Sequence, residues 1–133
     1  MINQVVLVGR LAADPEMTYT QSGTAITKFR LAVSRPPRRS SEEGAPAEEE
    51  TDWLDIVTWG NVAENVAQYL DKGALVGIEG RVQSRSWETQ EGQKRYGVEV
   101  NARNVQFLES KDEAERRRAR AGKGAAETEG GEL

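Results

Sequence analysis

Three tryptophans occupy positions where an aromatic ring is expected to face water. Trp53 and Trp59 lie in the run "WLDIVTW", and Trp87 ends the run "GRVQSRSW". Because strand side chains alternate between two faces, all three indoles fall opposite the aliphatic residues. An exposed ring is a surface on which any unpaired nucleobase can stack, at roughly 1–3 kcal/mol per base. Trp53 and Trp59 share one face and stand about 20 Å apart along the strand. This spacing predicts a stacking platform for single-stranded nucleic acid.

Basic residues accompany the three rings. Arg81 and Arg85 share the predicted face of Trp87, and Lys28 and Arg30 alternate with apolar residues in "TAITKFRLAVS". Guanidinium and ammonium groups neutralise phosphates, and a guanidinium also stacks on a base. Ordinary solvated surface is the alternative for each cation, and burial against the helix or another subunit is the alternative for the tryptophans. The candidate contact residues are Trp53, Trp59, Trp87, Arg81, Arg85, Lys28, Arg30, Arg35 and Arg95.

The composition offers little for catalysis. The chain contains no cysteine and no histidine, which removes thiolate chemistry and the usual general base near neutral pH. Its carboxylates are scattered singly or lie in polar segments, without metal-ligand spacing, and no GxxxxGK[ST] phosphate loop is present. We therefore expect a non-enzyme with no cofactor and no metal. A nuclease or nucleotide hydrolase is a rival that would require turnover dependent on a divalent metal.

The formal net charge of −4 comes largely from one segment. Residues 40–52 contain six acidic residues and no basic one, whereas the rest of residues 1–109 carries a net charge of +2. The body is therefore basic enough to attract a nucleic acid on one face. No apolar run approaches the length of a membrane span, and the N-terminal apolar patch is too short for a secretory signal. We expect a cytoplasmic protein without membrane association.

Alternation and turn signals predict five strands and one helix. The helix is expected over 61–72, capped by Asn61 with Glu64 as the capping-box partner and ended by Gly73. Residues 35–52 are expected to form a long loop. One helix between the third and fourth of five strands matches the OB-fold, a Greek-key barrel, and gives an all-β class with one helix. The expected strands are 2–11, 24–34, 53–59, 75–88 and 95–107.

The two ends of the chain carry further expectations. The first strand is apolar on both sides, so another subunit could cover its outer face. From residue 109 large apolar residues almost vanish, which predicts a domain over 1–110 and a flexible, disordered polar tail over 111–133, with a few helical turns possible through 112–121. The basic run from Arg116 to Arg120 could contact DNA or form a solvated linker, and both interpretations stay open.

Several segments together resemble the bacterial single-stranded DNA-binding protein family. They are "MINQVVLVGRLAADPE", "FRLAVSR", "TDWLDIVTWGNVAENVAQYLDKG", "VGIEGRVQSRSWET" and "GQKRYGVEVNARNVQFLES". The resemblance covers almost all of residues 1–110. It implies a homotetramer of OB-folds, associated with the nucleoid, that coats single-stranded DNA without sequence preference in replication, recombination and repair. It also implies that the three tryptophans occupy the family's stacking positions.

Two departures from the family pattern affect the expected partners. The family often places another stacking aromatic where Pro36 and Pro37 stand, so Arg35, Arg38 and Arg39 are expected to compensate electrostatically. The chain ends "ETEGGEL" and lacks the acidic Pro-Phe ending that recruits replication and repair proteins, which leaves that recruitment open. A replication-restart or RNA-binding OB protein, and a protein-interaction or assembly module, are the alternative functions.

Overall fold

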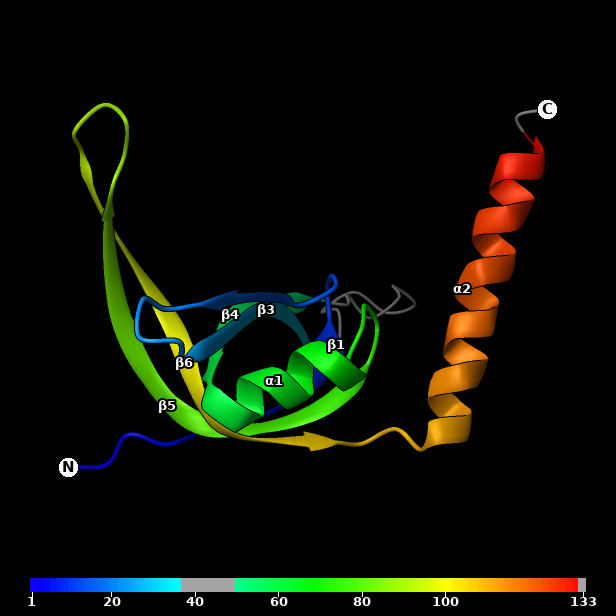
Figure 1. Cartoon of the computed structure of the whole chain (residues 1–133), viewed down its shortest axis with the longest axis horizontal. Helices are drawn as coiled ribbons and strands as arrows, with labels where there is room; N and C mark the ends of the chain where they lie inside the picture. Colours follow the sequence, from blue (N-terminus) through cyan, green and yellow to red (C-terminus); the bar gives the residue numbers. More distant parts are fainter. Residues whose placement is uncertain (37–49, 132–133) are drawn as a thin grey trace, which may run out of the picture.

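The computed structural model describes residues 1–36 and 50–131 of the chain. The described residues form six strands and two helices, one strand and one helix more than the sequence predicted. Figure 1 shows how these elements are arranged. The additional strand β2 is short and pairs with β3. It lies between the turn residues Asp14-Pro15 and Gln21-Ser22-Gly23, and the sequence analysis assigned no element to this segment. The elements are β1 (Val5–Leu11), β2 (Glu16–Tyr19), β3 (Ala25–Ser34), β4 (Thr51–Trp59), α1 (Gly60–Tyr69), β5 (Leu75–Glu88), β6 (Lys94–Phe107) and α2 (Lys111–Gly131).

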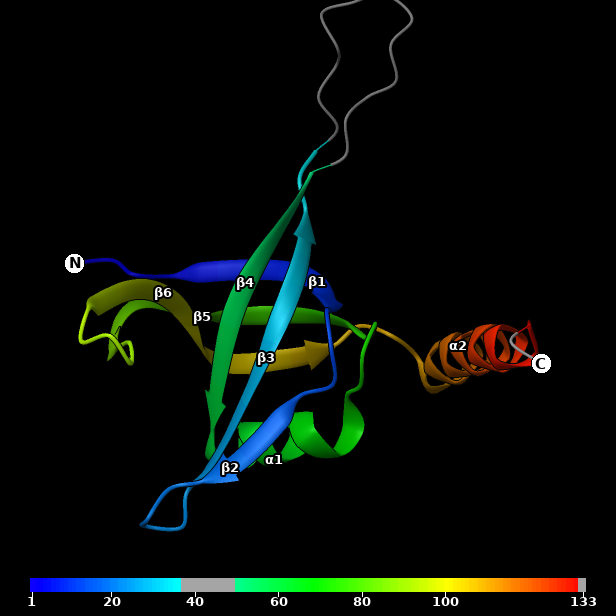
Figure 2. The ribbon, with the colours of Figure 1, turned by 90° about the horizontal axis from the view of Figure 1, so that it is seen from above.

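The strands form one sheet that closes on itself. Its order is β1-β5-β6-β4-β3-β2, and a further pairing between β1 and β3, at Arg10 opposite Ala32, joins the sheet into a ring. Every pairing is antiparallel except the short one between β4 and β6, where Ile56 lies opposite Val100. Figure 2 shows the crossing strands and α1 beside them. A closed Greek-key sheet with a helix between β4 and β5 is the OB-fold, as predicted.

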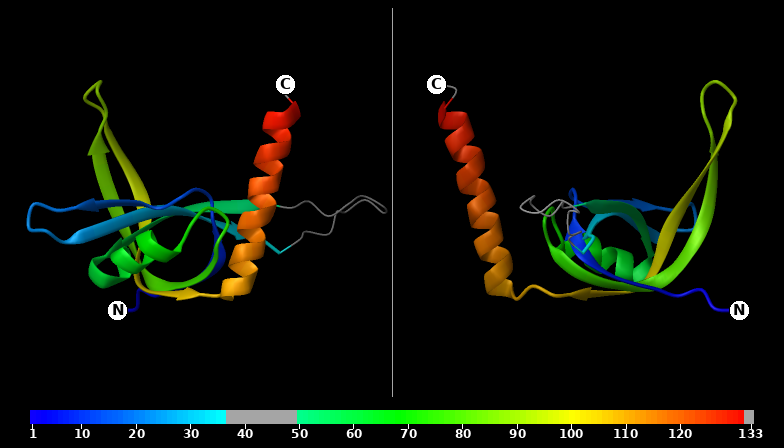
Figure 3. Two further views of the ribbon diagram at one scale, coloured as in Figure 1. Left: turned by 45° about the vertical axis from the view of Figure 1, so that its right-hand side comes forward. Right: turned by 180° about the vertical axis from the view of Figure 1, so that it is seen from behind.

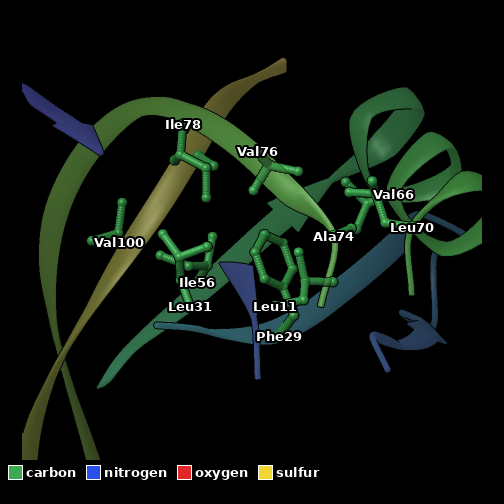
Figure 4. Packing of buried hydrophobic residues seen from close by; sticks show 11 residues of the cluster. Leu11, Phe29, Leu31, Ile56, Val66, Leu70, Ala74, Val76, Ile78 and Val100 are labelled. Carbon is green, nitrogen blue, oxygen red and sulfur yellow. The ribbon is translucent and has the colours of Figure 1, made fainter. Parts of the chain in front are cut away.

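Mainly apolar side chains from every second residue of the strands fill the barrel. On β3, Thr27, Phe29 and Leu31 point inward and are buried, as the period-two pattern predicts. Two buried threonines make hydrogen bonds inside the fold. Thr27 Oγ1 donates to the carbonyl of Ala63 in α1 at 2.7 Å, which attaches the helix to β3, and Thr58 Oγ1 on β4 donates to the carbonyl of Thr27 at 2.9 Å. Figure 4 shows this core, which is formed by Leu11, Phe29, Leu31, Ile56, Val66, Leu70, Ala74, Val76, Ile78, Val100 and Ala102.

Helix α1 starts earlier than the sequence suggested, and the predicted cap is wrong. Trp59 is the N-cap residue, with an extended backbone, and no side chain caps the helix. Gly60 takes a φ of +64°, a left-handed conformation that glycine adopts readily. This glycine lets β4 turn directly into the helix, so Asn61 already lies inside the first turn and cannot cap it with Glu64. The helix ends at Tyr69, before the turn that contains Gly73.

Strands β5 and β6 extend beyond the barrel as a long hairpin, which we call the arm (Figures 1 and 3). A β-bulge between Glu79 and Gly80 interrupts the regular pairing where β5 passes along the barrel. A side chain at Gly80 would overlap the carbonyl oxygen of Asn101 and come within 2.9 Å of Ala102 Cα. Glycine is therefore required here for the two backbones to approach and for the arm to continue from the barrel.

Helix α2 lies in the segment for which the sequence predicted a flexible tail. It is capped by Ser110, whose Oγ accepts a hydrogen bond from the Glu113 backbone N–H at 3.1 Å, and it has Asp112 and Glu113 in its first turn. The few helical turns that the sequence allowed thus extend to Gly131. The division into a domain over 1–110 and a disordered polar tail over 111–133 stays a prediction. Neither described helix has the length and apolar character needed to cross a membrane.

We expect Gly80→Ala to destabilise the fold by about 1–3 kcal/mol, since overpacking must move one of two paired backbones. Gly77→Ala is the matched control on the same strand, because a methyl group there would meet Leu108 Cδ1 at an ordinary 3.5 Å. Urea unfolding of both variants measures the difference. Equal stability of the two variants would contradict the close approach at Gly80.

Candidate nucleic-acid interface

The strand registers bring the predicted residues onto one outward face. On β4, Asp55 and Val57 lie between Trp53 and Trp59 on the same face. On the neighbouring strand β3, Arg30 lies opposite Asp55. The face continues across the parallel pairing of β4 with β6 and onto β5 and the arm. Because paired residues point to the same side of a sheet, these side chains form one surface. We call it the tryptophan face; it contains Trp53, Trp59, Lys28, Arg30, Arg81, Arg85, Trp87 and Arg95.

The three indoles lie on the surface rather than in the barrel. Trp53 is 54 % exposed, and Trp59 and Trp87 are each 44 % exposed. All five cations of the tryptophan face are exposed as well. Val57, which lies between the two rings on β4, is buried, so the exposed residues of the tryptophan face are interrupted at this one position. A large part of each ring is therefore accessible to a stacking partner.

Trp87 is positioned by a glycine on the opposite strand of the arm. Arg95 lies directly opposite Trp87, and Gly97 lies opposite Arg85. A Cβ atom at Gly97 would stand 3.0 Å from Trp87 Cζ3 and 3.2 Å from its Cη2. The indole therefore leans diagonally over the bare backbone of β6. The Arg85 guanidinium lies 4.9 Å from the centroid of the indole, within the range of a cation–π contact.

Arg85 also connects the arm to the barrel. Its guanidinium lies 3.4 Å from the Asp55 carboxylate on β4 and 4.0 Å from the Glu99 carboxylate on β6. A shallow hollow of about 250 Å³ opens beside this group, and Lys28 and Arg30 line it too. Arg30 also stands 5.9 Å from the Trp53 ring centroid. Three cations therefore meet in this hollow, together with four carboxylates, those of Asp14, Glu16, Asp55 and Glu99.

A polar network on the same face was missed by the sequence analysis. Gln83 Nε2 donates to Glu99 Oε1 at 2.8 Å, and Asn101 Nδ2 donates to Gln83 Oε1 at 3.4 Å. These side chains lie where the arm meets β4, since Asn101 is opposite Val57. Strand alternation could have indicated this network, because Gln83 lies on the same face of its strand as Arg81 and Arg85. The position of Gly97 had no periodic signal, since it depends on which strand lies opposite.

Arg35 lies apart from the other cations, at the base of the long loop. It donates to Asp52 at 2.8 Å and to Glu50 at 2.7 Å, and its backbone N–H donates to the Glu50 carbonyl. The hydrogen bond from Arg35 holds the pKa of Asp52 below its usual value. A phosphate at Arg35 would have to displace these carboxylates. Most of the acidic loop, with Pro37, Arg38 and Arg39, lies outside the described residues.

Metal-ligating chemistry has no counterpart in this part of the chain. Over residues 1–36 and 50–131, no group of three or more acidic residues is placed so that it could hold a metal ion. The tryptophan face instead combines flat rings, guanidinium groups and amides, which are groups that contact bases and phosphates without altering them.

A closed five-strand barrel, extended by a short sixth strand and carrying an aromatic and cationic outer face, defines an OB-fold of the oligonucleotide-binding kind. The profile of the "Single-strand binding protein family" matches residues 2–108, and the chain belongs to this family.

Curated relatives agree with this assignment. "Single-stranded DNA-binding protein" of Halalkalibacterium halodurans is 50% identical over 109 residues, which cover 82% of this chain and 62% of the relative. "Single-stranded DNA-binding protein A" of Bacillus subtilis is 49% identical over 112 residues, covering 84% of this chain and 62% of the relative. "Single-stranded DNA-binding protein 3" of Listeria innocua is 49% identical over 111 residues, covering 84% and 66%. The chain thus matches less than two thirds of the length of these relatives.

We expect Gly97→Val to displace the Trp87 ring, because the new side chain would occupy the space beneath it. In a background where Trp53 and Trp59 are replaced by Phe, the emission of Trp87 should shift to longer wavelength as the ring moves into water. Val98→Ala, on the opposite face of the arm, is the control and should leave the spectrum unchanged. An unaltered emission maximum in Gly97→Val would show that Gly97 does not position the ring.

Proposed function

We propose that this protein binds single-stranded DNA without sequence preference, and coats and protects it during replication, recombination and repair. The observation that carries the proposal is the exposure of three indoles on one continuous face beside arginine and lysine side chains. Family membership and the names of the relatives support it. We further propose that it acts by binding alone, without catalysis, in the cytoplasm at the nucleoid.

The mechanism follows from the geometry of the tryptophan face. Bases stack on Trp53, Trp59 and Trp87, and phosphates between them are neutralised by neighbouring cations such as Arg85. Stacking uses the flat face of a base and leaves its hydrogen-bonding edge unread, so binding tolerates any sequence. Because Arg85 is paired with Asp55 and Glu99 in the free protein, a phosphate exchanges one anionic partner for another. The strand is held extended, which prevents it from pairing again.

We propose a homotetramer with β1 in the interface. Val6 and Val8 of β1 face outward and are 70 % and 54 % exposed, an unusual arrangement for adjacent outward positions of one strand. In the described structure β1 pairs with β3 only at Arg10 and Leu11, which leaves the edge from Val5 to Val8 free for another strand. A second copy of the chain would cover both the apolar face and this edge.

We expect Trp87→Ala to weaken oligo(dT) binding by the roughly 1–3 kcal/mol of one stacking contact, to a similar extent for oligonucleotides of other sequences. Tyr96→Ala is the matched control, since Tyr96 is exposed on the opposite face of the same arm, across from Ser86. The measurement is a titration monitored by tryptophan fluorescence, whose quenching should also report the binding. Tight binding should weaken as salt is raised.

Unchanged affinity for oligo(dT) after replacement of both Trp59 and Trp87 by Ala would contradict the stacking assignment. A clear preference for RNA over DNA of the same sequence would favour an RNA-binding OB protein. Salt-independent association of the tryptophan face with a protein would instead favour an assembly module.

We expect the double variant Val6→Glu/Val8→Glu to reduce the mass in light scattering from a tetramer to a smaller species, because the charges would be buried in the interface. Met17→Glu is the control, since it adds a charge at another exposed apolar position, on β2. A tetrameric mass for the double variant, or a monomeric mass for the unaltered chain at micromolar concentration, would contradict this interface.

A further inference from the structure

Helix α2 stands beside the barrel (Figure 1), and one arginine attaches its first turns to the fold. The guanidinium of Arg117 donates to Asp71 Oδ1 at 2.8 Å, to Glu109 Oε2 at 3.0 Å and to the carbonyl of Lys72 at 2.7 Å. Its side chain is only 19 % exposed, and that of Glu109 only 10 %. Arg118 adds a second contact to Asp71, at 3.1 Å. The helix is therefore attached at a defined rotation about its axis.

These contacts are ionic at neutral pH. Partial burial of Asp71 opposes its ionisation, but hydrogen bonds from Arg117 and Arg118 hold its pKa below the usual value. Burial likewise opposes the ionisation of Glu109, which hydrogen bonds from Arg117 and from the Leu75 backbone N–H overcome, so its pKa is lowered too. Both carboxylates thus remain charged and bound to α2.

The attachment of Arg117 directs the neighbouring arginines of α2 toward β1. Arg116 and Arg120 are one helical turn apart and share a side of the helix. A hollow of about 460 Å³ opens between α2 and β1, and we call it the arginine hollow. Four basic and two acidic side chains line it: Arg10, Arg116, Arg117, Arg120, Glu109 and Glu113.

The acidic groups of the hollow do not neutralise all of its cations. Glu109 is already occupied by Arg117, and Arg10 approaches it only to 3.7 Å while donating to the Gly73 carbonyl at 2.9 Å. Among the described residues, neither Arg116 nor Arg120 has a carboxylate within 4.0 Å. The arginine hollow thus presents exposed guanidinium groups, the chemistry that binds a phosphate.

The arginine hollow is continuous with the tryptophan face. Arg10 lies opposite Ala32, and Ala32 lies opposite Trp53, so the three residues follow one another across β1, β3 and β4. Two strand spacings amount to about 10 Å. A nucleic-acid strand that leaves Trp53 across the small side chain of Ala32 therefore reaches Arg10 without turning around the molecule.

We propose that the arginine hollow is a second phosphate-binding site, which takes the backbone of single-stranded DNA after it leaves the tryptophan face. The proposal rests on the proposed function, because the strand arrives from Trp53. Arg10, Arg116 and Arg120 contact phosphate oxygens, whereas Arg117 is a positioning residue that keeps α2 in place. A short oligonucleotide that covers only the tryptophan face does not reach the site, and a longer one does.

The test compares oligo(dT) of increasing length, bound to the full chain at several salt concentrations. The variant is Arg116→Gln/Arg120→Gln, and the control Arg103→Gln/Lys111→Gln removes the same charge from exposed positions that do not line the hollow. Each phosphate contact contributes about 0.7 to the slope of log affinity against log salt for a single strand. For long oligonucleotides we expect the slope of the variant to fall by at least one such contact relative to the control. For the shortest oligonucleotides the two slopes should be equal.

If the salt-dependence slopes of the variant and the control were equal at every oligonucleotide length while tryptophan quenching persisted, the arginine hollow would not be a phosphate-binding site. The proposed function would then still stand. A difference of equal size at every length would also overturn the phosphate-binding site, because that result indicates a general effect of charge. Absence of quenching by oligo(dT) in the unaltered chain would instead overturn the proposed function. Circular dichroism of both variants verifies that the helix content is retained.

Discussion

The closure of a small barrel is the constraint on which the rest of this structure depends. The interior of such a barrel is filled by one set of side chains, and strand alternation sends every other residue outward. Leu11, Leu31 and Ile56 occupy that interior and fix the registers of β1, β3 and β4. Once the registers are fixed, the residues that alternate with this core set must point away from the barrel interior. Trp53 and Trp59 are exposed for this reason, and the cations of β3 stand beside them.

The arm applies the same alternation without an interior to fill. Its two strands leave the barrel after the bulge at Gly80, and Gly97 provides the space over which Trp87 leans. Arg85 then links this indole to Asp55 on the barrel. The proposed binding surface therefore extends over β3, β4, β5 and β6. In it the guanidinium group of Arg30 lies near the Trp53 ring and that of Arg85 near the Trp87 ring. In the proposed complex a phosphate replaces Asp55 as a partner of Arg85, and the release of counterions from the DNA makes binding sensitive to salt.

Alternation in the sequence was sufficient to predict the barrel and the outward tryptophans, because both depend on a period of two that the core residues impose. It was not sufficient where structure depends on pairing across the fold. Gly97 is informative only once Trp87 is known to lie diagonally across from it, and strand β2 was hidden because turn residues surround it. The Asn61 cap was expected from a local motif, but Gly60 allows β4 to enter the helix directly. Ser110 and Glu113 are a different case, because their S-x-x-E spacing was present in the sequence but was not used to predict α2, which Ser110 caps.

The central claim is that the exposed indoles are the surfaces on which unpaired bases rest. Acrylamide quenching of tryptophan fluorescence lifetimes tests it most directly, because this small neutral molecule reaches only rings that are open to solvent. The account predicts efficient quenching of the free protein and strong protection when oligo(dT) is bound at saturation. Equal quenching constants with and without the bound oligonucleotide would show that the DNA lies elsewhere, and would contradict the account.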